Sequence, residues 1–268
     1  MSAHRPNILF AIADDASHMS AYGHTFVSTP AFDRVAAEGV LFTNAFTTNP
    51  KCAPSRASIL TGRHTWQLEA SCNHFNVWPA KFPVYPDILA AAGYHVGFTG
   101  KGWAPGDWKR EGRSTNPAGP EYSGRTLDPP SSTIKNKDYA ANFVDFLDAR
   151  PPETPFCFWY GGHEPHRPYE PGEGARHGKM TDLDEIPRYL PLETIVQEDL
   201  ADYAFELEWF DSQLGTMLEE LERRGELDNT LVVVTSDNGM PFPRVKGNMY
   251  DYDFRLPMAL MWREATKD

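Results

Sequence analysis

A cysteine, a proline and an arginine stand close together in the run from Cys52 to Arg63, and their spacing suits chemistry on an anion. The run has the composition of a short helix, and Pro54 fits its first turn. Arg56 then lies about one turn beyond Cys52, close enough to hold an anion beside the thiol. The free N–H groups at a helix start add positive potential. We interpret Cys52 as a nucleophile, or the precursor of one; an inert buried cysteine would not explain these neighbours.

Two pairs of oxygen donors form a second candidate group. Asp14 and Asp15 follow the apolar run 7–13, and Asp237 and Asn238 follow the run 231–235. Carboxylate and amide oxygens are the ligands that Ca²⁺ and Mg²⁺ prefer. The chain has no Cys/His cluster at zinc spacing, which argues against zinc. Each pair alone could be a loop start or a turn, but together with Cys52 they predict one site for a hard divalent cation.

Strands and helices alternate along the chain in a way that would bring these groups together. Short apolar runs predict strands at 7–13, 40–42, 95–99, 155–160, 231–235 and 257–262. Helical spacing predicts helices near 30–38, 52–62, 86–92, 137–149 and 197–224. This alternation predicts an α/β fold with a mainly parallel central sheet sandwiched by helices. The stretches 103–133 and 169–195 are expected to be long loops.

In a parallel sheet, ligands bind beyond the carboxyl ends of the strands. Several polar residues follow directly after predicted strands, at what should be one edge of the sheet. They are Asp14, Asp15, Lys101, His163, His166, Asp237 and Asn238. We therefore expect a single site at this edge.

The run Cys52–Arg63 resembles the signature of the type I, formylglycine-dependent sulfatases of the alkaline phosphatase superfamily. The matching residues are Cys52, Pro54, Ser55, Arg56, Leu60, Thr61, Gly62 and Arg63. The resemblance implies an alkaline-phosphatase-like fold and conversion of Cys52 to Cα-formylglycine by a dedicated maturase. It also implies one divalent cation, Ca²⁺ or alternatively Mg²⁺, held by Asp14, Asp15, Asp237 and Asn238.

The same resemblance implies roles for further residues. Lys101 and Lys246 would contact the sulfate, Arg56 would stabilise the hydrated aldehyde at residue 52, and His166 would protonate the leaving group. Many sulfatases carry Lys-x-His at the first lysine, whereas this chain has Lys101-Gly102-Trp103. The missing imidazole points to His163 or His74 as its replacement. Further candidates for substrate binding, each also readable as a surface or packing residue, are Trp103, Arg110 and Arg113.

Within the family, the chain is most similar to the heparan N-sulfatase (N-sulfoglucosamine sulfohydrolase) group. The supporting segments are 74–76, 165–167, 236–239 and 241–243. The resemblance implies a sulfated sugar or glycosaminoglycan substrate, such as N-sulfated glucosamine at a chain end. Two alternatives stay open: a phosphoester or phosphonate hydrolase of the same superfamily, and a truncated domain that binds sulfated glycans without cleaving them.

Composition narrows the class of protein. The 268 residues are 41% hydrophobic, enough for one sizeable core, and the net charge of -12 argues against a nucleic-acid partner. An anionic substrate must therefore be attracted by a local basic cluster. No apolar run is long enough to span a membrane. Residues 1–5 show no signal-peptide pattern, which fits a cytoplasmic protein or a sequence that lacks its exported start.

Two further expectations concern the ends and the remaining thiols. Residues 1–268 correspond to a sulfatase catalytic N-terminal domain, and the smaller C-terminal subdomain that the resemblance implies would be missing, as in a fragment or a truncated relative. Cys72 and Cys157 are left as a pair that could form a disulfide if Cys52 is reserved for chemistry.

Overall fold

A six-stranded sheet forms the centre of the computed structural model, which describes residues 5–179 and 186–265. The strand order is β2-β8-β7-β1-β6-β4. The bounds are β1 Asn7–Ala13, β2 Val40–Phe46, β4 His95–Gly100, β6 Phe156–Gly161, β7 Thr230–Ser236 and β8 Arg255–Met261. Strands β4, β6, β1 and β7 are parallel, whereas β8 is antiparallel to both β7 and β2. The mainly parallel sheet expected from the sequence is confirmed.

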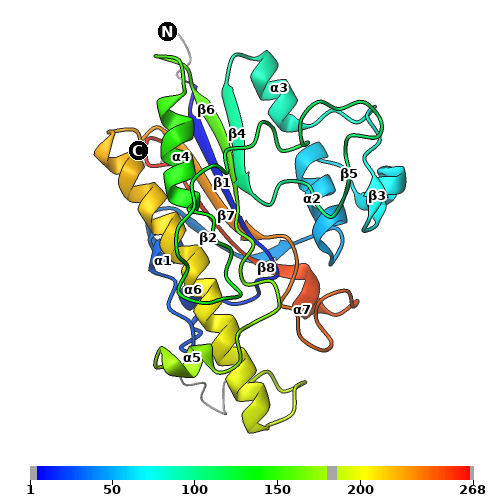
Figure 1. The fold of residues 1–268 in the computed structure, drawn as a ribbon, viewed down its shortest axis with the longest axis vertical. Helices are drawn as coiled ribbons and strands as arrows, with labels where there is room; N and C mark the ends of the chain where they lie inside the picture. The colour runs from blue at the N-terminus through cyan, green and yellow to red at the C-terminus, as the bar shows by residue number, and fades with distance from the viewer. Residues whose placement is uncertain (1–4, 180–185, 266–268) are drawn as a thin grey trace.

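Helices cover both faces of this sheet (Figure 1). Helices α1 (Pro30–Ala37), α4 (Tyr139–Asp148) and α6 (Thr194–Arg223) pack on one face. Helices α2 (Cys52–Thr61) and α3 (Tyr85–Ala91) lie on the other. The short elements are η1 Ser20–Tyr22, η2 Thr65–Gln67, η3 Glu69–Cys72, β3 Asn76–Val77, β5 Gly106–Asp107, α5 Glu173–Arg176 and α7 Asp251–Phe254.

The two-residue period of β1 divides its side chains between two cores. Leu9 and Ala11 pack into the larger core with α1, α4 and α6, whereas Ile12 faces the smaller core beneath α2. Helix α1 is tied to α6 because the backbone N–H groups of Ala31 and Phe32 each donate to the Asp211 carboxylate, at 2.8 Å. These hydrogen bonds hold α1 and α6 together on one face of the sheet.

A close backbone approach positions the residue after β4. Gly100 has a φ of 76°, and a Cβ at this position would lie 2.0 Å from the carbonyl oxygen of Gly161. Only glycine fits there without displacing β6. The backbone N–H of Lys101 then donates to the same Gly161 oxygen at 2.7 Å, which fixes the start of the Lys101 segment at the sheet edge.

Several expectations need correction. The stretch 103–133 is not simply a surface loop, because Trp103 and Ala118 are buried in the smaller core. All three cysteines are free, with Cys72 exposed and Cys157 buried in β6, so the pair left open by the sequence does not form. No helix in the described ranges is both long and apolar enough to cross a membrane. Residues 1–4, considered for a leader, and 180–185 of the second loop lie outside the described residues.

Candidate active site

The four predicted oxygen donors meet in one buried cluster at the carboxyl ends of β1 and β7. Donor atoms of Asp14, Asp15, Asp237 and the Cys52 thiol all lie within 4.8 Å of one another. The Asn238 side-chain N–H donates to Asp15 Oδ1 at 2.7 Å. The other amide atom, Asn238 Oδ1, is buried and has no hydrogen-bond partner in the part of the chain that the structure describes. Three carboxylates and an orphaned amide oxygen fit a hard divalent cation well.

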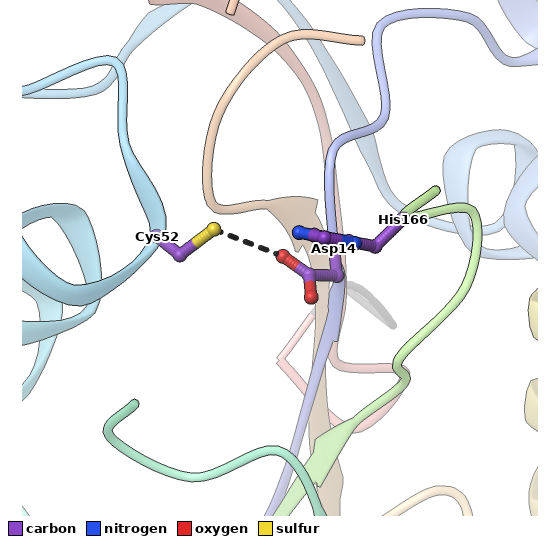
Figure 2. A group of neighbouring side chains, drawn as sticks. All are labelled: Asp14, Cys52 and His166. Carbon is purple, nitrogen blue, oxygen red and sulfur yellow. Dashed lines mark hydrogen bonds between the residues drawn. The ribbon is translucent and has the colours of Figure 1, made fainter. Parts of the chain in front are cut away.

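Cys52 is the first residue of α2, and its thiol points at this cluster. Its Sγ lies 3.3 Å from Asp14 Oδ1 and 3.8 Å from Asp15 Oδ1. Figure 2 shows Cys52 on one side of Asp14 and His166 on the other. Burial raises the pKa of the Cys52 thiol well above its usual value, and the charges of Asp14 and Asp237 raise it further. A reactive cysteine needs a lowered pKa, so the residue is a poor nucleophile as a thiol and suits the role of a precursor.

Three cationic side chains are paired with the three carboxylates. Arg56 Nε lies 2.7 Å from Asp237, Lys101 Nζ 2.5 Å from Asp14, and Lys246 Nζ 2.6 Å from Asp15. Burial alone would raise the pKa of Asp14, but the ammonium of Lys101 and the guanidinium of Arg56 outweigh it and hold that pKa far below its usual range. Asp14 is therefore ionised at neutral pH.

Arg56 is fully buried and held rigidly. Its Nη1 donates to the carbonyl oxygen of Lys101 at 2.7 Å, in addition to the ion pair with Asp237. Its Nη2 lies 3.9 Å from Asp14 and has no hydrogen-bond partner among the described residues. One donor of the guanidinium thus remains free beside Cys52 and Asp14.

A pocket of about 530 Å³ opens above Cys52 and Asp14, and three histidines line it. Burial lowers the pKa of His163 to about 3. Burial, with the charges of Lys51, Lys246 and Lys101, lowers that of His74 to about 4. Both imidazoles are consequently neutral at neutral pH. His166 is more exposed, with its Nε2 3.8 Å from Asp15.

Comparison with known proteins identifies the family of this chain. The sulfatase family model matches residues 6–268. The chain belongs to the sulfatase family. It is 32% identical over 276 residues to human N-sulphoglucosamine sulphohydrolase, a match that covers 91% of this chain and 52% of that enzyme. The chain thus spans about half the length of this relative.

Two solved structures share the sulfatase fold of this chain at low identity. A putative sulfatase from Bacteroides fragilis aligns with a TM-score of 0.79 and 21% identity, covering 98% of this chain and 69% of that one. The phosphonate monoester hydrolase of Agrobacterium radiobacter aligns with a TM-score of 0.72 and 19% identity, covering 97% and 68%. The fold alone therefore does not separate sulfate from phosphonate chemistry.

Three residues considered for substrate binding lie away from this sulfatase pocket. Trp103 is buried, donates from Nε1 to the Ala53 carbonyl oxygen at 3.0 Å, and packs edge-on against Trp78. It supports α2 from behind instead of forming a pocket wall. Arg110 is exposed and outside the lining, and Arg113 is paired with Asp87 at 2.9 Å. The polar sequence of the loop 103–133, which contains all three residues, does not indicate which side chains turn inward.

The pocket lining also includes residues that the sequence did not single out: Thr133, Lys135, Glu164 and Glu206. Glu164 could have been found, because it stands between His163 and Pro165 directly after β6. Glu206 also left a signal, since it lies near the apolar face of α6 and is only 2% exposed. Thr133 and Lys135 carry no such pattern.

Proposed function

We propose that this protein hydrolyses sulfate esters or sulfamates of sugars, with residue 52 acting after conversion of Cys52 to Cα-formylglycine. The observation that carries this proposal is the position of the Cys52 side chain. It lies within 4.8 Å of the Asp14, Asp15 and Asp237 carboxylates, at the floor of a pocket that also exposes Lys101 and His166. A maturase partner is part of the proposal, because the buried thiol is a poor nucleophile by itself.

Asp14, Asp15, Asp237 and Asn238 would hold one divalent cation, Ca²⁺ or alternatively Mg²⁺. The bound cation would stabilise negative charge on the reacting oxygens. The aldehyde at residue 52 would add water to form a gem-diol, and one hydroxyl oxygen of this diol would be the nucleophile. The lysines that now contact Asp14 and Asp15 share these carboxylates with the cation site. Lys101 and Lys246 would then direct part of their charge toward the oxygens of a bound sulfate group.

The remaining residues act through fixed geometry. Arg56 is held by Asp237 and the Lys101 carbonyl, so its free Nη2 is a preorganised donor beside residue 52. His166 Nδ1 lies 2.6 Å from the carbonyl oxygen of Arg167 and must donate a proton to it. Its Nε2 is left to exchange a proton with the leaving group. The neutral imidazoles of His163 and His74 serve as uncharged hydrogen-bonding groups around the sulfate.

The proposed substrate is a sulfated sugar, including N-sulfated glucosamine. The pocket volume of about 530 Å³ falls in the range of small-molecule sites and exceeds what a sulfate group alone would need. The human relative is an N-sulphoglucosamine sulphohydrolase by name. Both observations support a sugar that is held around its sulfate group.

Phosphoester or phosphonate hydrolysis is the second candidate, because a phosphonate monoester hydrolase shares the fold. Enzymes with two catalytic metals bind a second ion with further ligands. Among the described residues, the clusters that could hold a metal all centre on Asp14 and Cys52, which favours one cation and sulfate. A binding domain without turnover is the outcome expected if Cys52 is never converted.

A substrate comparison tests the proposed function. Protein produced together with a maturase should release sulfate from 4-nitrophenyl sulfate and from glucosamine N-sulfate. We expect its kcat/KM for the aryl sulfate to exceed that for 4-nitrophenyl phosphate by about 100-fold or more. A chelator should abolish turnover, and Ca²⁺ or Mg²⁺ should restore it. Faster phosphate release, or turnover that is indifferent to the chelator, would contradict the proposal.

A further inference from the structure

One wall of the pocket takes no part in the proposed chemistry. It consists of Thr133, Lys135, Glu164 and Glu206 and faces the same cavity as Cys52 and Asp14. Because the cavity is larger than a sulfate group requires, a sugar ring placed over Cys52 would extend toward this wall.

Glu164 ties the Lys135 segment to the histidine loop of the site. The backbone N–H of Lys135 donates to Glu164 Oε1 at 2.9 Å, and the Tyr139 hydroxyl donates to Glu164 Oε2 at 2.9 Å. The same hydroxyl oxygen accepts the backbone N–H of His163 at 3.2 Å. Glu164 is only 2% exposed, so the wall and the His163 loop are held together by a buried network.

Lys135 differs from the other cations of the site in having no carboxylate partner. Arg56, Lys101 and Lys246 are each paired with a metal-site carboxylate. Among the described residues, no carboxylate lies within ion-pair distance of the Lys135 ammonium, and the side chain is exposed at the pocket surface. Its charge is thus available to a ligand.

The acidic residues of this wall do not form an ion pair with that ammonium. Both oxygens of Glu164 accept hydrogen bonds within the buried network. Glu206 accepts a hydrogen bond from the Thr133 hydroxyl at 2.7 Å, and burial raises its pKa to about 8. The Glu206 carboxyl is therefore mostly neutral at pH 7. The wall offers an unpaired ammonium beside the Thr133 hydroxyl and the Glu206 carboxyl, which suit hydrogen bonding to sugar hydroxyls.

We propose that Lys135 binds a second anionic group of the sugar, so that the site prefers saccharides carrying a sulfate or carboxylate in addition to the group that is hydrolysed. This inference rests on the proposed function, because it assumes that a sulfated sugar occupies the pocket. A monosulfated sugar would leave the Lys135 ammonium facing solvent, whereas a second anion would form a charge-assisted hydrogen bond with it. Lys135 is accordingly a specificity-determining residue.

The test measures binding in a Cys52→Ala background, where turnover plays no part. Calorimetry compares glucosamine N,6-O-disulfate with glucosamine N-sulfate, and a disaccharide of N-sulfated glucosamine with a uronic acid provides the carboxylate arm. We expect at least one doubly anionic ligand to bind about tenfold more tightly than the monosulfate. Lys135→Gln should remove this preference and leave monosulfate affinity within about twofold, and Lys135→Arg should retain it.

The matched control is Lys109→Gln, which removes an exposed lysine outside the pocket lining and should change neither affinity. The inference is overturned if neither doubly anionic ligand binds more tightly than the monosulfate in the parent protein. It is also overturned if Lys135→Gln weakens all the ligands equally. Failure of the wild-type protein to release sulfate would count against the proposed function alone, because the binding preference is measured without turnover.

Discussion

Replacing Cys52 with alanine should lower sulfate release by ~10⁴-fold or more while the protein stays folded. The thiol lies 3.3 Å from Asp14 and is the side chain that the proposed conversion acts upon, so alanine removes the proposed source of the nucleophile. Alanine keeps the Cβ at the start of α2 and removes one buried sulfur atom, for which we expect a loss of about 1–2 kcal/mol in the free energy of unfolding. Turnover with an aryl sulfate and urea unfolding measure the two effects separately.

Cys157→Ala is the matched control for this substitution. Cys157 is also a buried free cysteine, but it lies within β6, and burial is what raises the pKa of its thiol to about 12. Its removal should cost similar stability and leave turnover within about threefold, because the side chain contacts no reacting group. Turnover of Cys52→Ala within tenfold of the wild type would contradict the assigned role.

Arg56→Ala should have the largest effect on stability and a large effect on turnover. The arginine is fully buried and is the ion-pair partner of Asp237 at 2.7 Å, so truncation leaves a buried carboxylate without its counter-charge. Removing one partner of a buried pair costs about 3–5 kcal/mol. Loss of the preorganised Nη2 donor should lower turnover by about 10²–10³-fold. The loss in the free energy of unfolding should be greatest when a chelator has removed the cation, because a bound cation would partly balance the negative charge of Asp237.

Arg113→Ala is the control for the Arg56 substitution, because its partner Asp87 is about half exposed. Such a pair contributes at most about 1 kcal/mol, so the control should unfold near the wild-type urea concentration and keep its turnover. If Arg56→Ala were as stable as Arg113→Ala, the buried pairing with Asp237 would not be a main support of the site.

The stability effect of Arg56 was not accessible from the sequence. From spacing alone, Arg56 is expected to face an anion next to Cys52, and this spacing indicates no structural role. The structure places Asp237, a residue far away in the chain, against the same guanidinium. A salt bridge between distant segments depends on how α2 lies against the carboxyl end of β7, and no local pattern around residue 56 indicates it.

The sheet and the oxygen donors were predictable for a common physical reason. Apolar runs buried on both faces mark the central strands, and parallel strands bring their carboxyl ends to one edge. Asp14, Asp237 and Lys101 each follow such a strand, so their convergence follows from topology. The antiparallel direction of β8 was not predicted, because its short apolar run carries no information on direction.

The pocket walls were less predictable. Trp103 was considered as a pocket wall, but it turns back against Trp78 and supports α2. The loop that contains it has no two-residue or helical period, so nothing in the sequence fixes which side chains face inward. Lys135 was also missed, because its position depends on a hydrogen bond to Glu164, which is distant in the sequence.

The proposed hydrolysis depends on conversion of Cys52 to Cα-formylglycine. The mass of the peptide that spans this residue tests the conversion most directly. We predict that, in preparations that release sulfate, the peptide is lighter by about 18 Da than its cysteine form, as expected for replacement of the thiol carbon by an aldehyde. The converted fraction should rise in step with specific activity when a maturase is co-produced. A fully active preparation in which residue 52 remains an unmodified cysteine would contradict the account.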